Sequence, residues 1–230
     1  MYTRLQCNFT TSKTATVNRR VKEKNRNLEK ETEIDSINRL KIFYTNADCL
    51  TNKRSELLMI IQNSERKPDV IAIVEVKPKY SRYSVTSSEF NIEGYTLFTN
   101  NLEERTTRGI IVLVRRDIDV KQIEIRGEVQ EVVTIEIDSG TKENKVTIMV
   151  IYRSPSSTKE NDEALFKLID DVSEKGGCLL MVGDFNLPNI CWDNWQTNEG
   201  KGDIEVKLID KLRKNYLSQH ITTPTRYREN

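Results

Sequence analysis

The strongest constraint on the fold is a series of apolar segments of strand length that each end at polar residues. Residues 70–74 form an uninterrupted apolar run, which is typical of a strand covered on both faces. Residues 146–151 and 178–182 have the same character, and the latter run stops at Gly183. All three are too short for helices. A chain organised around them is expected to contain a buried β-sheet.

The remaining pattern adds more strands and a few helices. Residues 40–44, 95–98 and 109–114 are further strand candidates, and residues 119–125 and 129–137 alternate as a hairpin does, with Arg126-Gly127 near its turn. Apolar residues at helical spacing predict three helices. The first is capped at Thr51 or Asn52 and carries Leu57, Leu58 and Ile61 on one face, and the others cover residues 164–172 and 203–217. Many strands with about three helices predict an α/β fold of two packed sheets with helices outside.

The charge is unevenly distributed along the chain. Residues 1–30 carry eight basic and two acidic residues, or +6, which leaves −5 for residues 31–230 of a chain whose total is +1. Residues 1–38 lack apolar periodicity and are predicted to be a disordered basic arm, followed by one domain over residues 39–230. Such an arm is either a solvated tail or a loose nucleic-acid contact. Because no aromatic residues are interleaved with the charges, the solvated tail is favoured.

The cysteines and the hydropathy limit the class of protein. Cys7, Cys49, Cys178 and Cys191 are spaced too widely for a metal knuckle, and no apolar signal segment precedes them. No apolar run approaches the roughly 20 residues of a membrane span. We therefore expect an intracellular protein with reduced thiols and no membrane partner.

Asp184 and Asn186 follow the apolar run 178–182 with one residue between them. Side chains two positions apart in a strand lie on the same side, so this carboxylate and amide could together orient a water, a metal ion or a phosphate. The same residues could equally form an Asx-type turn that ends at Pro188. The segment alone leaves both interpretations open.

Three other strand candidates end in the same way. Asn46 follows residues 42–44, Glu75 follows residues 70–74, and Tyr152 ends the run that begins at residue 146. If these strands are neighbours in the sheets, their polar ends meet at one rim, where scaffolded sites tend to lie. Carboxylates, amides and a phenol without histidine or cysteine suit Mg²⁺ or Mn²⁺ rather than zinc.

Five segments occur in an order that resembles a known superfamily. They are Tyr44-Thr45-Asn46-Ala47, Ile73-Val74-Glu75-Val76-Lys77-Pro78-Lys79, Tyr152-Arg153-Ser154-Pro155, Gly183-Asp184-Phe185-Asn186 and Pro224-Thr225-Arg226. Over residues of about 40–230 the chain resembles the endonuclease/exonuclease/phosphatase superfamily, above all the apurinic-type endonuclease domain of jockey-like or CR1-like non-LTR retrotransposons. The resemblance implies a four-layer α/β/β/α sandwich and Mg²⁺-dependent cleavage of a DNA strand. In such elements the cut primes reverse transcription, so a reverse transcriptase domain is an expected partner.

The resemblance also implies a role for each site residue. Glu75 would hold the metal with help from Asn46. Asp184 would activate or orient the attacking water, and Asn186 would position the phosphate. Tyr152 would donate to a phosphate oxygen, and Arg153 would bind substrate. The chemistry is consistent, because a metal ion neutralises the scissile phosphate while a fixed carboxylate makes the water more nucleophilic.

The chain departs from the superfamily pattern in one respect. Members continue past Pro-Thr-Arg to a strand with an Asp and then to a Ser-Asp-His motif, whose His and Asp partner are central to catalysis. The sequence stops at Asn230 without that motif, and its one histidine, His220, precedes Pro224. His220 is expected to be a structural or surface residue. A truncated sandwich, incomplete at its C-terminal end and inactive by itself, is the expectation.

Two further hypotheses about the function stay open. The chain could be a non-catalytic remnant that binds nucleic acid weakly through its basic arm, or a superfamily phosphatase that acts on a small or lipid phosphoester. The Glu-Val-Lys-Pro-Lys segment and the Pro-Thr-Arg ending favour the retroelement branch. DNA is then the expected partner, and the nucleus an expected location.

Overall fold

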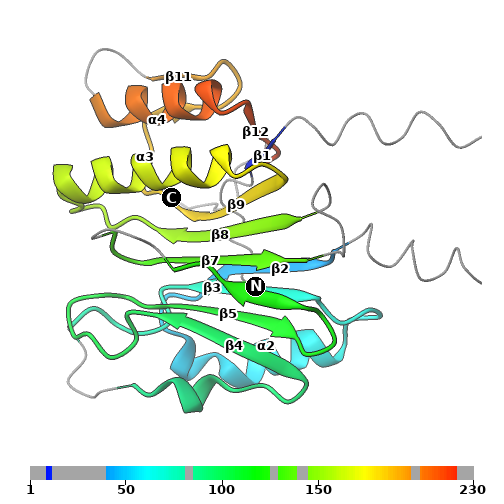
Figure 1. The fold of residues 1–230 in the computed structure, drawn as a ribbon. Coiled ribbons are helices and arrows are strands. Elements are labelled where there is room, and N and C mark those ends of the chain that lie inside the picture. The colour runs from blue at the N-terminus through cyan, green and yellow to red at the C-terminus, as the bar shows by residue number, and fades with distance from the viewer. Residues whose placement is uncertain are drawn as a thin grey trace, which may run out of the picture.

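Two β-sheets pack face to face with helices on both outer sides, which gives four layers (Figure 1). This computed structural model describes residues 9–11, 40–80, 85–124, 129–138, 145–197 and 203–221. The predicted α/β/β/α sandwich is therefore confirmed. Among the helices of the described residues, none has the length and hydropathy needed to cross a membrane.

In the part of the chain that the structure describes, the first sheet has six strands in the order β12-β1-β9-β8-β7-β6. The strands are β1 (Phe9–Thr11), β6 (Val120–Gln122), β7 (Val132–Ile137), β8 (Val146–Tyr152), β9 (Cys178–Asp184) and β12 (Leu217–Gln219). At its centre β8 and β9 run parallel, with Tyr152 opposite Asp184. The carboxyl ends of the two strands therefore meet at one rim. The predicted hairpin is the antiparallel pair β6 and β7.

The described residues also form a second sheet, with four strands in the order β2-β3-β5-β4. They are β2 (Ile42–Asn46), β3 (Val70–Val74), β4 (Tyr95–Asn100) and β5 (Ile110–Arg115). In this sheet β2 and β3 are parallel, with Asn46 opposite Val74, so they too end side by side. A separate two-stranded pair, β10 (Ile190–Cys191) and β11 (Gln196–Thr197), follows β9 in the chain.

Within the described ranges, three α-helices cover the sheets, namely α2 (Arg54–Gln62), α3 (Lys159–Glu174) and α4 (Asp203–Lys214). Helix α3 begins at Lys159, ahead of the predicted residues 164–172, and the side chain of Thr158 at its N-cap accepts a hydrogen bond from Asn161 N. The predicted caps of α2 are wrong. Residues Leu50–Asn52 form a short 3-10 turn, η2, and Lys53 occupies the N-cap. The cause is tertiary, since Leu50 N donates to Val76 O at 2.7 Å and fixes this segment against the end of β3.

Three apolar layers separate the four structural layers. The middle one lies between the sheets and includes Val74, Val112, Ile135, Val150 and Val182. An outer one joins the first sheet to α3 and α4 through Met149, Met181, Leu165, Ile169 and Leu212. The third joins the second sheet to α2 and to the 3-10 turn η3 (Ser87–Phe90) through Leu57, Ile61, Ile73, Phe90 and Leu113. Because both faces of β3 are covered, its five residues are apolar throughout.

The predicted boundaries of the arm and of the last helix need correction. Residues 9–11, which we assigned to a disordered arm, form β1 and pair with both β9 and β12. The other residues of the predicted arm lie outside the described residues. Helix α4 ends at Lys214 rather than near residue 217, and β12 follows it. Arg126-Gly127 and Pro224-Thr225-Arg226 also lie outside the described residues.

Gly183 is expected to tolerate no side chain. A Cβ at this position would lie 2.1 Å from the carbonyl oxygen of Ile151 on β8, inside the parallel ladder. Gly183→Ala should therefore force the two central strands apart and lower the free energy of unfolding by about 1–3 kcal/mol, measured by urea denaturation. Ser218→Ala, on the exposed face of β12, is the control and should change that energy by less than about 0.5 kcal/mol. Equal stability of both variants would contradict this packing.

Candidate active site

The polar ends of four strands from both sheets meet at one rim. Asn46 ends β2, Glu75 follows β3, Tyr152 ends β8 and Asp184 ends β9. Hydrogen bonds of Asn46 connect the two sheets there. Its Nδ2 donates to Glu75 Oε1 at 2.5 Å and to Asp184 Oδ2 at 2.9 Å, across 138 residues of sequence. The structure thus brings together residues that the sequence placed at separate strand ends.

Asn46 fixes the two carboxylates at a defined separation. Its Oδ1 accepts a hydrogen bond from Asp48 N at 3.0 Å, so the amide is held at both ends. Asn46, Glu75 and Asp184 are 4%, 8% and 1% exposed. Carboxylates are buried to this degree only when they are paired or hydrogen-bonded. The amide therefore orients two acidic groups in a protected position.

Unusual backbone conformations surround these side chains. Glu75 (φ 54°), Asn186 (φ 50°) and Asp48 (φ 43°) are left-handed although none is glycine. Such conformations cost roughly 1–2 kcal/mol per residue and tend to gather where function requires a particular side-chain direction. At Glu75 the turn comes directly after β3 and ends the strand's extended path at the site residue.

The Asp184-Phe185-Asn186 segment is both an Asx-type turn and part of the rim. Asn186 N donates to Asp184 Oδ1 at 3.1 Å, which is the turn that the sequence allowed. The other oxygen of the same carboxylate contacts Asn46, and Asn186 Nδ2 donates to Arg153 O at 2.8 Å. The two interpretations do not exclude one another, since the turn holds Asp184 in place.

Tyr152 lies 7% exposed between these groups. Its burial, together with the negative charges of Glu75, Glu131 and Asp184, raises the pKa of the phenol well above its usual value near 10, while Arg108 opposes the shift. The hydroxyl therefore keeps its proton in neutral and mildly alkaline solution. It is available as a hydrogen-bond donor to an anion.

This shift predicts a steep loss of stability in alkali. In the unfolded chain Tyr152 loses its proton near pH 10, whereas the folded chain retains it, so unfolding becomes easier as the pH rises above 10. The free energy of unfolding should fall faster in the wild type than in Tyr152→Phe, by as much as about 1.4 kcal/mol per pH unit. Urea titrations between pH 8 and 11 measure the difference. Parallel curves for the two proteins would contradict a buried, protonated Tyr152.

The side chain of Arg153 is hydrogen-bonded inside the protein. The side chain is 7% exposed, and its Nε and Nη2 donate to the two carboxylate oxygens of Asp162 on α3 at 2.7 and 2.9 Å. Its Nη1 donates to Phe185 O at 3.4 Å. Arg153 therefore joins α3 to the turn that carries Asp184 and Asn186. Its assignment to substrate binding stays a prediction.

Sequence reasoning missed a charged residue of the rim, Arg108. Its Nη2 donates to Asp48 Oδ1 at 2.6 Å and also forms an ion pair with Glu75 Oε2. Arg108 lies in the loop before β5, not at the exit of an apolar strand, and its partners are 60 and 33 residues away. No signal in the sequence connects these positions. Asp48 could have been found, since it lies two residues after Asn46.

Two buried charges hold the loop that carries Arg108. Glu131 Oε1 accepts hydrogen bonds from Arg108 N and Gly109 N at 2.6 and 2.8 Å, while Lys77 Nζ donates to Thr107 O at 2.7 Å and to Glu104 O. Burial raises the pKa of Glu131 and lowers that of Lys77. The loop is therefore fixed through its backbone on both sides of Arg108.

The donor set at the rim fits a hard divalent cation. Glu75 and Asp184 offer carboxylate oxygen atoms beside the Asn46 amide, and Mg²⁺ is commonly held by one or two carboxylates together with water and substrate phosphate. Over the described ranges, no group of three His, Cys, Asp or Glu side chains is arranged as a complete metal-ligand set. The carboxylates of Glu75 and Asp184 are therefore the groups at this rim that could hold such a cation.

Comparison with solved structures identifies the fold. The endonuclease domain of TRAS1, a telomere-specific non-LTR retrotransposon, superposes with a TM-score of 0.53 at 19% identity, over 77% of this chain and 71% of that one. The apurinic endonuclease LMAP from Leishmania major gives 0.59 at 12% identity, over 85% and 72%. The 3′-phosphatase NExo from Neisseria, solved with a product DNA hairpin, gives 0.52 at 16%, over 77% and 71%.

The chain has the fold of the endonuclease/exonuclease/phosphatase superfamily. More narrowly, residues 146–230 match the model of the family described as endonuclease-reverse transcriptase. The resemblance to this superfamily is therefore confirmed at the level of the fold. A search of curated protein sequences found no significant match.

Proposed function

We propose that this chain is a DNA endonuclease domain that hydrolyses a phosphodiester bond with the help of Mg²⁺ or Mn²⁺. The observation that carries the proposal is the double hydrogen bond from Asn46 Nδ2 to Glu75 and Asp184. It holds two carboxylates from two different sheets in one protected place. A purely structural rim would not require two buried acids beside a buried, protonated phenol.

Each side chain has a distinct part in the proposed reaction. Glu75, with Asn46 beside it, would hold the cation, which neutralises charge on the scissile phosphate when bound. Asp184 would accept a proton from the attacking water, and Asn46 and Asn186 keep its carboxylate in position. Tyr152 would donate its retained proton in a hydrogen bond to a phosphate oxygen as negative charge develops there. Arg153 supports the turn that carries Asp184 and Asn186.

We propose DNA as the substrate and a retroelement as the setting. Two of the similar structures support this choice by their names, a retrotransposon endonuclease domain and a phosphatase solved with a DNA hairpin. The family matched by residues 146–230 combines an endonuclease with a reverse transcriptase. A reverse transcriptase domain is accordingly the partner we propose, and the nucleus the place of action.

We propose that residues 1–230 alone cleave DNA little or not at all. The resemblance makes a His and its Asp partner, in a segment that includes a Ser-Asp-His motif, central to catalysis, and residues 1–230 do not contain that motif. Their one histidine, His220, is exposed beyond the end of β12. The extended chain is a fusion of residues 1–230 to the C-terminal segment of a superfamily endonuclease with a Ser-Asp-His motif. This fusion contains the His and its Asp partner.

Nicking of supercoiled plasmid DNA tests the proposal. The extended chain should convert supercoiled to open circular plasmid in Mg²⁺ or Mn²⁺ and not in EDTA, while residues 1–230 should do so far more slowly. Lack of nicking by a folded extended chain, or nicking that EDTA leaves unchanged, would overturn the proposed function. A folded state is verified beforehand by circular dichroism and a cooperative urea transition.

A further inference from the structure

Arg108 places a positive charge where the proposed cation is needed. The guanidinium contacts Glu75, the proposed cation ligand, and Asp48, two residues after Asn46. Arg108 and Glu75 side chains are 17% and 11% exposed, while Asp48 is 75% exposed. Since partly buried charge pairs are screened little by solvent, Arg108 strongly affects the electrostatics around Glu75.

Hydrogen bonds to the backbone of Arg108 and Gly109 fix the position of Arg108. Glu131 accepts from the amides of Arg108 and Gly109, and Lys77 N donates to Arg108 O at 3.0 Å. Gly109 has a φ of 72°, and a Cβ there would lie 2.7 Å from Leu102. The turn is therefore built to direct the Arg108 side chain to this rim.

One donor of Arg108 has no acceptor. Its Nε is buried, and the described part of the chain offers no hydrogen-bond partner to it. A buried donor without a partner is unfavourable, and for a charged group more so. The fork of donors in a guanidinium matches the oxygen geometry of phosphate as well as that of carboxylate. The unsatisfied Nε therefore suggests that Arg108 has another partner than the carboxylates.

We propose that Arg108 is an exchangeable counter-cation of this site. Without a divalent cation, Arg108 forms ion pairs with Glu75 and Asp48. When a divalent cation binds at Glu75, the guanidinium is released and contacts a phosphate oxygen of the DNA. The proposal rests on the proposed function. Arg108 then lowers the affinity of the site for the divalent cation, because the two positive charges compete. It raises the affinity for DNA, because it attracts the phosphate.

Arg108→Gln separates the two effects. On residues 1–230, Mn²⁺ binding followed by electron paramagnetic resonance should become at least about fivefold tighter, since a competing charge is removed. DNA affinity, measured by fluorescence anisotropy with Ca²⁺ present, should weaken by about tenfold through the loss of a charged hydrogen bond. Arg108→Lys retains the charge, so its Mn²⁺ affinity should stay close to wild type, while its DNA affinity falls because lysine lacks the planar fork.

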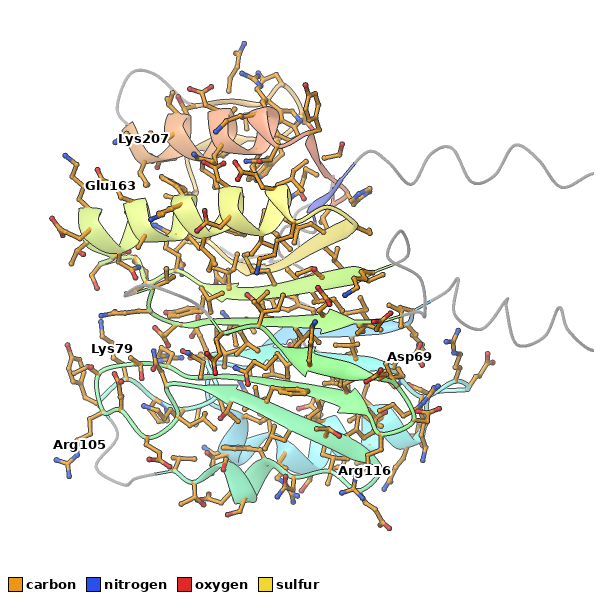
Figure 2. The ribbon with its side chains drawn as sticks, in the orientation of Figure 1. Asp69, Lys79, Arg105, Arg116, Glu163 and Lys207 are labelled. Carbon is orange, nitrogen blue, oxygen red and sulfur yellow. The ribbon has the colours of Figure 1, made fainter. Side chains whose placement is uncertain are left out.

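Arg105→Gln is the matched control. Arg105 lies in the same loop, is exposed, and points away from the protein in Figure 2. Both affinities should stay within about twofold of wild type apart from a small general effect on DNA binding. Circular dichroism of each variant verifies that the loop change has not unfolded the domain.

The outcomes distinguish this inference from the proposed function. Equal or weaker Mn²⁺ binding by Arg108→Gln overturns the inference, and nicking by the extended chain would then still support the proposed function. Unchanged DNA affinity in Arg108→Gln also overturns it. If neither wild type nor Arg108→Gln binds Mn²⁺, both the inference and the metal-dependent function are wrong.

Discussion

Replacement of Asp184 by asparagine is expected to slow DNA cleavage by the extended chain by about 10²–10⁴-fold, the range found when a general base is lost. Asp184 is 1% exposed, and its two oxygens accept from Asn186 N and from Asn46 Nδ2. Asparagine keeps the size of the side chain and removes its charge. Because asparagine can accept only one of these two hydrogen bonds, a cooperative urea transition first verifies that the variant is folded, and the rate then reports the loss in the chemical step.

Single-turnover cleavage of an end-labelled DNA duplex at saturating enzyme measures that step. Asp193→Asn is the control, because Asp193 is an exposed carboxylate on the turn between β10 and β11 and should leave the rate within about twofold of wild type. DNA affinity should change little in either variant. An Asp184→Asn rate above a tenth of the wild-type rate would show that Asp184 is not the base.

Asp162→Ala is expected to remove about 3–5 kcal/mol from the free energy of unfolding. Asp162, on the first turn of α3, is 5% exposed and accepts from Arg153 through both oxygens and from Ser157 Oγ. Its loss leaves the buried guanidinium of Arg153 without a counter-charge. Since domains are stable by roughly 5–15 kcal/mol, the variant should be close to unfolding.

Urea denaturation measures this loss, with Asp171→Ala as the control on the exposed side of the same helix. The double variant Arg153→Met with Asp162→Leu should regain most of the stability, because an apolar pair replaces the buried charges. Its DNA affinity then tests the role predicted for Arg153. Weak DNA binding by a stable double variant would support a substrate contact, and unchanged binding would leave Arg153 a structural role. An Asp162→Ala variant as stable as Asp171→Ala would contradict the buried pair.

Strands with strong apolar runs could be predicted from the sequence, and so could the residues at their ends. The run over residues 70–74 is fully buried in β3, and Asn46, Glu75 and Asp184 meet at the rim where parallel strands end. Strands β1 and β12 could not be predicted in this way. Each has three residues, and polar ones such as Thr10 and Ser218 give no apolar periodicity. Their place in the sheet depends on pairing between distant parts of the chain.

The predicted site was incomplete for the same reason. Arg108 reaches Glu75 only because Glu131 and Lys77, from other parts of the chain, hold its loop. Arg153 was predicted to bind substrate from the resemblance alone, while in the structure its charge is paired with Asp162 inside the protein. Strand-end patterns locate a rim, but they do not show which charges there are already paired. That information depends on tertiary contacts.

The most direct test of a cation site at the ends of β3 and β9 is Mn²⁺ binding by residues 1–230, followed by electron paramagnetic resonance. This measurement needs neither turnover nor the extended chain. Glu75→Gln should weaken Mn²⁺ binding by at least about tenfold, as expected when a charged ligand is lost, while Glu93→Gln, an exposed carboxylate before β4, should bind as the wild type does. Equal Mn²⁺ affinity in Glu75→Gln and wild type would contradict a cation site at Glu75.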